Sequence, residues 1–145
     1  MLEALKGIAS GMKTTLSMLK EPRDTYPYPE KRRELAPRYR GKHMLAVDED
    51  GHELCVGCGL CEAVCPAHAI RVVAAGAEGD RTVSWTERYA VDYEVDLIRC
   101  IFCGMCEEAC PTNAVRLTPF NELAAYDRRD MIPKKDELLA PPVRR

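Results

Sequence analysis

The amino-acid sequence predicts a small α+β domain that contains one cysteine-rich segment in two copies and has extended termini. Three observations favour this fold class: the duplicated segment, a strand-like alternation over residues 88–96, and an apolar stripe at helical spacing in the first 20 residues. The chain has 145 residues, 46% of them hydrophobic, which suffices for one compact domain. We expect a docking segment at 1–44, the main domain at 45–120 and a docking tail at 121–145.

The two copies lie at a constant offset of 45 residues, and each reads C-x₂-C-x₂-C-x₃-C-P. In bacterial ferredoxins with this spacing, three close thiolates bind three corners of a [4Fe–4S] cluster, and the fourth cysteine binds the other cluster. The sequence therefore predicts a ferredoxin-like domain with two [4Fe–4S] clusters and exchanged fourth ligands. The first cluster is assigned Cys55, Cys58, Cys61 and Cys110, and the second is assigned Cys100, Cys103, Cys106 and Cys65.

The residues between the cysteines suit loops that wrap closely around a cluster. Gly57, Gly59 and Gly104 allow the backbone to approach sulfur. Pro66 and Pro111 follow the fourth cysteine of each copy, and proline is favoured in the first turn of a helix. We therefore expect short helices at 67–70 and 112–115.

Other metal chemistry is less consistent with this pattern. Structural zinc sites usually combine two close cysteine pairs, and disulfides are typical of secreted proteins. The histidines, His43, His52 and His68, are scattered, and we interpret each as a surface or hydrogen-bonding residue and not as a ligand. His68, three residues after Cys65, is the one candidate for a pH-dependent neighbour of a cluster. No residue is expected to act as an acid, base or nucleophile.

The residues between the two copies predict an inserted β-hairpin. Residues 70–75 are mostly apolar, 76–80 have turn composition, and 88–96 alternate in polarity. We expect this alternation to place four side chains on one face: Tyr89, Val91, Tyr93 and Val95.

The first 44 residues are basic, with ten Lys or Arg against five Asp or Glu, whereas the remainder is acidic. They begin with an amphipathic helix whose apolar side chains are Leu5, Ile8, Ala9, Met12, Leu16 and Leu19. A proline-rich, basic strap follows at 22–40. The helix suits a membrane surface or a partner protein, and packing on this chain's own core is the less natural alternative. Nucleic acid is not expected to be the partner, because no recognised binding motif accompanies the basic residues.

In the tail, Asn121 is placed to cap a short helix through about Asp127, and residues 134–139 predict another helical turn. Leu138 and Leu139 have no evident core of their own, so we expect the tail to dock on a neighbour. No stretch approaches the roughly 20 apolar residues of a membrane span, and no targeting sequence is evident, so a cytosolic, reducing location is expected.

Together these features resemble the NuoI-type (TYKY-type) subunit family of respiratory complex I, the NADH:quinone oxidoreductase. The likeness covers nearly the whole chain, and the cysteine runs alone would not identify it, because free ferredoxins share them. It includes Tyr28-Pro29, the segment Pro37 to His43, both cysteine runs, Tyr93 to Asp96, Tyr126-Asp127, and Lys135 to Leu139.

The resemblance implies a non-catalytic electron relay in a proton-pumping translocase, from the NADH and flavin side toward a terminal cluster beside quinone. It implies as partners the other hydrophilic-arm subunits, including the terminal-cluster and quinone-site subunits, and the adjoining membrane subunit. It also implies peripheral membrane contact through the N-terminal helix, at the cytoplasmic face of a bacterial membrane. The alternatives are a ferredoxin-like subunit of a membrane-bound hydrogenase or formate-oxidising complex, a free ferredoxin, and a zinc module.

Overall fold

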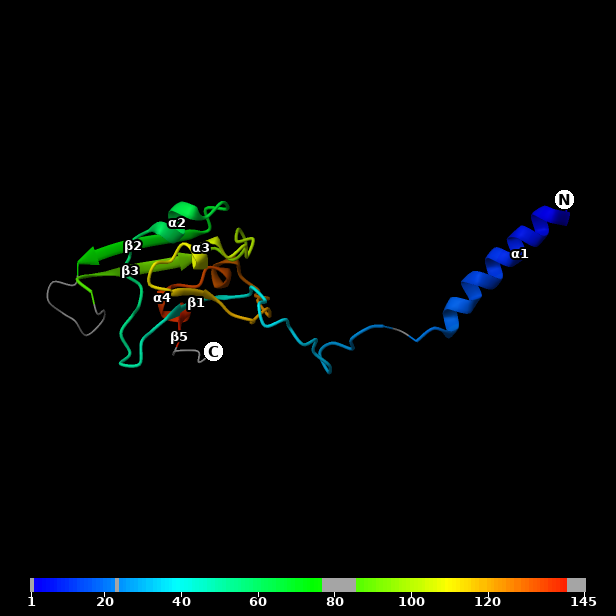
Figure 1. Cartoon of the computed structure of the whole chain (residues 1–145), viewed down its shortest axis with the longest axis horizontal. Coiled ribbons are helices and arrows are strands. Elements are labelled where there is room, and N and C mark those ends of the chain that lie inside the picture. Colours follow the sequence, from blue (N-terminus) through cyan, green and yellow to red (C-terminus); the bar gives the residue numbers. More distant parts are fainter. Residues whose placement is uncertain (1, 23, 77–85, 141–145) are drawn as a thin grey trace. The chain divides into compact units, whose positions relative to one another are not determined.

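A computed structural model describes residues 2–22, 24–76 and 86–140, and the chain divides into two compact units, Met1–Glu34 and Leu35–Arg145 (Figure 1). The turn expected at 76–80 lies almost entirely outside the described residues. We describe each unit by itself.

The first unit consists of a helix and an irregular segment. Helix α1 is Leu2–Ser17, and the 3₁₀ turn η1 is Met18–Lys20. None of the residues of α1 is buried, and its stripe is exposed, with Ile8 at 62% and Leu16 at 58%. The apolar face of α1 is therefore exposed among the described residues of its unit.

The second unit contains two small sheets. In the first sheet, β1 (His43–Ala46) lies between β4 (Val115–Leu117), which is antiparallel to it, and β5 (Leu139–Ala140), which is parallel to it. In the second sheet, β2 (Ile70–Gly76) pairs antiparallel with β3 (Arg88–Val95), and the two strands lie side by side in Figure 1.

The duplication in the sequence is also visible in the fold. Each cysteine run contains one short helix, α2 (Leu60–Val64) or α3 (Met105–Glu108), and continues into β2 or β4. Ile70 in β2 pairs with Val95, and Val115, which is 45 residues after Ile70, pairs with Leu45. The two halves therefore combine strands from distant parts of the chain around one core.

The short helices lie before the fourth cysteine of each run, and those expected at 67–70 and 112–115 are absent from these described residues. There the chain makes a turn and enters a strand. His68 and Asn113 occupy equivalent positions with positive φ, 47° and 52°, and a left-handed residue interrupts a right-handed helix.

Strand β3 also differs from the simple alternation. Val73 pairs with Asp92 but Ala74 pairs with Ala90, so Val91 is an extra residue in a β-bulge. The bulge changes the direction of the side chains before it: Ala90 and Tyr93 are fully buried, whereas Val91 is 48% exposed. The prediction that Val91 shares a face with Tyr93 and Val95 was wrong for this reason.

The tail also departs from expectation, because it completes the core. Leu138, at the end of α4 (Lys135–Leu138), is 1% exposed within the central cluster of buried side chains. Residues 121–127 are not helical. The cap is instead Asp127, whose carboxylate accepts a hydrogen bond from the Arg129 amide at the start of η2 (Arg128–Met131).

Candidate metal centre

The eight cysteines gather around two small cavities. One cavity is lined by Cys55, Cys58, Cys61 and Cys110, and the other by Cys65, Cys100, Cys103 and Cys106. The fold thus brings the last cysteine of each run to the other run's first three. All eight cysteines are free thiols.

Left-handed backbone positions shape both cysteine loops. Gly59 (φ 75°) and Gly104 (φ 83°) directly precede α2 and α3. Gly57 has φ 61°, and a Cβ there would lie 2.9 Å from both the Cβ of Ala74 and the carbonyl oxygen of Tyr89. At the equivalent position of the second loop, Phe102 adopts φ 53° despite its side chain. The sequence shows the glycines but gives no sign of a left-handed phenylalanine.

Backbone amides point at the sulfur atoms, as a bound cluster requires. The Ala69 amide donates to Cys65 Sγ at 3.3 Å, and the equivalent Ala114 amide donates to Cys110 Sγ at 3.2 Å. The Phe102 amide likewise donates to Cys100 Sγ at 3.3 Å. Such hydrogen bonds stabilise negative charge on thiolate sulfur.

The electrostatics of the two sites favour a cationic occupant. Burial, with the negative charge of neighbouring thiolates, raises the pKa of Cys55 to about 11 and that of Cys106 to about 12. Burial raises the pKa of Cys61 and Cys100 as well. At Cys110 burial also raises the pKa, but hydrogen bonds from Val115 and its neighbours outweigh it and the net shift is downward. Thiols with raised pKa values lose their protons only to a bound cation, and a set of four cysteines is the ligand set of a [4Fe–4S] cluster, so the donor set fits such a cluster.

Two buried rings contact these thiols. The hydroxyl of Tyr93, which is fully buried, donates to Cys61 Sγ at 3.5 Å. Burial, and then the negative charge of Cys61, raises the pKa of Tyr93 far above its ordinary value, so the hydroxyl keeps its proton. His43 is 3% exposed, with Nε2 at 3.9 Å from Cys100 Sγ, and burial lowers the pKa of His43 to about 4. The ring is therefore neutral near pH 7.

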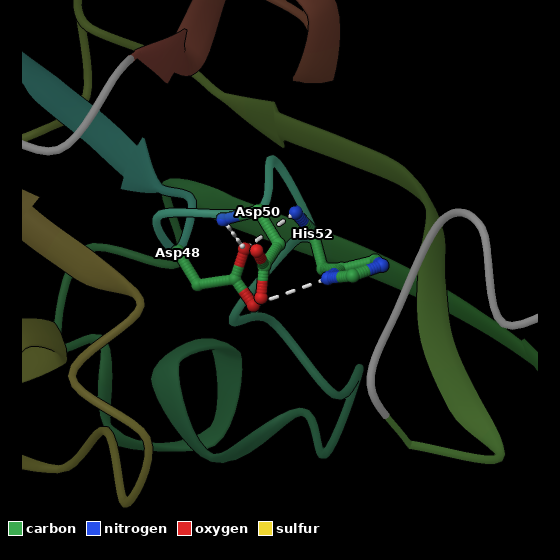
Figure 2. Close-up of side chains that lie close together, drawn as sticks. All are labelled: Asp48, Asp50 and His52. Carbon is green, nitrogen blue, oxygen red and sulfur yellow. Dashed lines mark hydrogen bonds and ion pairs between the residues drawn. The ribbon is translucent and has the colours of Figure 1, made fainter.

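Of the three histidines, the sequence analysis named only His68 as a candidate neighbour of a cluster, beside its interpretation as a surface or hydrogen-bonding residue. His68 is exposed, whereas His43 lies beside Cys100. The two-residue periodicity of a strand could have indicated that His43 is buried, since it places His43 on the same face as the core residue Leu45. His52 lies in a turn with Asp48, where its Nδ1 is 3.2 Å from Asp48 Oδ2 (Figure 2). The Asp48 carboxylate also accepts hydrogen bonds from the backbone amides of Asp50 and His52. Hydrogen bonds within the turn therefore explain why these three side chains lie close together.

Arg40 joins the end of the basic strap to the second cysteine loop. Its guanidinium donates to the Cys103 carbonyl and, at 3.3 Å, to the carboxylate of Glu108. A Cβ on Gly104 would lie 2.8 Å from Arg40 Nε, so a larger residue there would displace the Arg40 side chain. Sequence reasoning treated Arg40 only as part of a charged segment.

Comparison with known proteins gives consistent matches. The family described as "4Fe-4S dicluster domain" matches residues 54–114. NADH-quinone oxidoreductase subunit I of Cytophaga hutchinsonii is 50% identical over 138 residues, covering 94% of this chain and 79% of that protein. NADH-quinone oxidoreductase subunit I 1 of Symbiobacterium thermophilum is 49% identical, and the match covers 95% of this chain and 85% of that protein. NADH-quinone oxidoreductase subunit 9 of Thermus thermophilus is 44% identical, and the match covers 93% of this chain and 74% of that protein.

Among solved structures, a chain of the membrane-bound sulfane sulfur reductase, an archaeal respiratory membrane complex, matches with a TM-score of 0.54 and 30% identity. The match covers 80% of this chain and 55% of that one, so our chain spans little more than half of its length. The two thiol-lined cavities, the dicluster match and relatives at 44–50% identity over nearly the whole chain agree. The chain belongs to the NADH-quinone oxidoreductase subunit I family, with an α+β ferredoxin-like domain for two [4Fe–4S] clusters.

Proposed function

We propose that this chain is the electron-transfer subunit of a NADH-quinone oxidoreductase (complex I), relaying single electrons from the NADH and flavin side toward the terminal cluster and quinone. The observation that carries the proposal is the grouping of eight thiols into two sets of four within one domain, in a chain 50% identical to a subunit I. The chain acts as a non-catalytic part of the translocase, because its site offers ligands and hydrogen-bond donors to a redox centre.

The ligand sets follow the two cavities. Cys55, Cys58, Cys61 and Cys110 hold the first cluster, and Cys100, Cys103, Cys106 and Cys65 hold the second. Each bound cluster supplies one-electron oxidation and reduction. The chain's own residues position the thiolates, donate amides to sulfur and exclude water. Because each half provides a ligand to the other half's cluster, the two sites are held in one core.

The outer parts of the chain serve docking. Helix α1 has an exposed apolar stripe and lysines, which suits a membrane surface or an adjoining membrane subunit. In the described residues, no helix is both long enough and apolar enough to span a membrane. We place the subunit peripherally, on the cytoplasmic face of a bacterial membrane. The β2–β3 hairpin is an insertion that adds contact surface for neighbouring hydrophilic-arm subunits, and the segments 1–44 and 121–145 contact the same assembly.

The test is purification of the tagged full chain from native membranes in mild detergent, with identification of the copurifying chains and assay of NADH-driven quinone reduction. We expect flavin, terminal-cluster, quinone-site and membrane subunits together with that activity. Copurification of a hydrogenase or formate-oxidising subunit would refute the assignment to complex I. Recovery of the chain alone in the soluble fraction would identify a free carrier and also refute the proposal.

A further inference from the structure

We propose that Tyr93 and His43 set the potentials of the two clusters separately, each by donating one side-chain hydrogen bond to a ligand of a different cluster. Both are positioning residues for a thiolate. The inference rests on the ligand sets proposed above, and it concerns a property of the sites beyond electron relay.

The two rings occupy corresponding positions in the duplicated fold. Tyr93 in β3 pairs with Val72, and His43 in β1 pairs with Leu117. Val72 and Leu117 are separated by 45 residues, the offset of the cysteine runs. Each half of the domain therefore presents one buried polar ring from the same register position, a tyrosine toward the first cluster and a histidine toward the second.

Tyr93 is suited to a permanent donor role. Its hydroxyl lies 3.5 Å from Cys61 Sγ, and its side chain is fully buried. A ligating thiolate can only accept a hydrogen bond, so the Tyr93 hydroxyl is the donor. The ring belongs to the same cluster of buried side chains as Cys55 and Cys61 of the first ligand set and Cys106 of the second. Tyr93 therefore lies where the ligands of both clusters converge, with its hydrogen bond committed to the first.

His43 has the corresponding role at the second cluster. Its Nε2 is 3.9 Å from Cys100 Sγ, and its Nδ1 is buried with no hydrogen-bond partner in the described part of the chain. A ligating thiolate can only accept a hydrogen bond, so the ring nitrogen that faces Cys100 must be the donor, and Nδ1 has nothing to donate to among the described residues. The tautomer that satisfies both conditions has its proton on Nε2, directed at Cys100. Because its distance to sulfur is longer, His43 should affect the potential of its cluster less than Tyr93 does.

The direction of the effect follows from charge. The reduced cluster carries one more negative charge than the oxidised cluster, so a donor to its thiolate stabilises the reduced form more and raises the potential. Loss of the donor lowers the potential of that cluster. The two rings differ in donor strength and distance, so they separate two potentials that the duplicated loops would otherwise make similar.

The experiment compares variants of the full chain with both clusters bound, by redox titration monitored by electron paramagnetic resonance. The variant Tyr93→Phe removes the hydroxyl and keeps the ring. For histidine, His43→Asn keeps a nitrogen at the unpaired Nδ1 position, whereas His43→Gln keeps a donor at the Nε2 position. The variants Cys65→Ser and Cys110→Ser assign each signal to a ligand set, and iron content reports whether clusters are bound.

For Tyr93→Phe we expect the first cluster's potential to fall, with the ratio of reduced to oxidised cluster at fixed potential changing by about tenfold, or about 59 mV for one electron. The potential of the second cluster should not change. For His43→Asn we expect a smaller fall in potential, at the second cluster alone. The variant His43→Gln should restore the wild-type potential of that cluster. Unchanged potentials, equal shifts at both clusters, or loss of iron in Tyr93→Phe would each overturn the inference. A wild-type chain without about eight irons would instead refute the proposed cluster assignment.

Discussion

A buried ion pair joins the C-terminal segment to the first cysteine loop, and it provides a sharp test of the packing. Lys135 Nζ in α4 lies 2.7 Å from Glu53 Oε1, and the two side chains are only 12% and 10% exposed. Lys135 also donates to the Ala90 carbonyl at 2.7 Å, and its charge lies 5.1 Å from the centre of the Tyr89 ring. Glu53 is two residues before Cys55, a proposed ligand of the first cluster, so the pair holds the start of the first cysteine loop.

Replacing Lys135 with Met should leave Glu53 buried without its counter-charge. Breaking a buried pair from one side typically costs about 3–5 kcal/mol, since the remaining charge is uncompensated. With a urea dependence of about 1–3 kcal/mol per molar, the unfolding midpoint should fall by about 2 M. The assay is the loss of the clusters' visible absorbance from the cluster-bound full chain in urea without oxygen.

The adjacent lysine provides a matched control. Lys134 Nζ is 4.0 Å from Glu94 Oε1, and its side chain is 69% exposed, so the variant Lys134→Met should lose about 0–1 kcal/mol. The double variant Glu53→Gln with Lys135→Met should be less destabilised than the sum of its single variants, because it removes both charges. Equal midpoints for Lys135→Met and Lys134→Met would refute the reasoning.

Three further predictions follow from single positions. The variant Gly41→Ala should lower the free energy of unfolding by about 1–3 kcal/mol or more in the same assay, because its Cβ would meet the backbone carbonyls of Phe120 and Thr118; an unchanged urea midpoint would contradict this. The variant Leu138→Ala should cost about 2–5 kcal/mol in the same assay, as the residue is 1% exposed, and a neutral result would mean that the tail does not complete the core. The variant Leu16→Asp should leave iron content and midpoint unchanged but reduce copurification of the membrane subunits, whereas wild-type recovery would argue against α1 as the docking element.

The features that the sequence predicted well are local or repeated. The run of helix-spaced apolar residues predicted α1, and cysteine spacing predicted which thiols gather around each cavity. The ligand roles of those thiols remain a prediction. Gly57, Gly59 and Gly104 were expected to let the backbone approach sulfur, and their left-handed angles are a finding of the structure.

The features that the sequence did not predict depend on long-range pairing or on unusual backbone angles. Leu138 becomes buried because the adjacent β5 pairs in parallel with β1, far away in the sequence. The short helices fail to form after the prolines because His68 and Asn113 are left-handed, and neither proline indicates this. Val91 leaves its expected face because a bulge adds one residue, which periodicity alone cannot reveal.

The roles of His43 and Tyr93 were missed for a related reason. Each was evaluated against its neighbours in sequence, whereas its position depends on a strand pairing with the opposite half of the duplication. The 45-residue offset aligns Val72 with Leu117, but His43 and Tyr93 are 50 residues apart, so the offset alone does not relate the two rings.

The exchange of fourth ligands between the halves is the central structural claim, and Cys65→Ser tests it most directly. The measurement is the electron paramagnetic resonance spectrum of the reduced full chain, beside the matched variant Cys110→Ser. We predict that Cys65→Ser damages the cluster held by Cys100, Cys103 and Cys106 and leaves intact the one held by the run that contains Cys65, and that Cys110→Ser does the reverse. Loss of only the first run's cluster in Cys65→Ser would contradict the account.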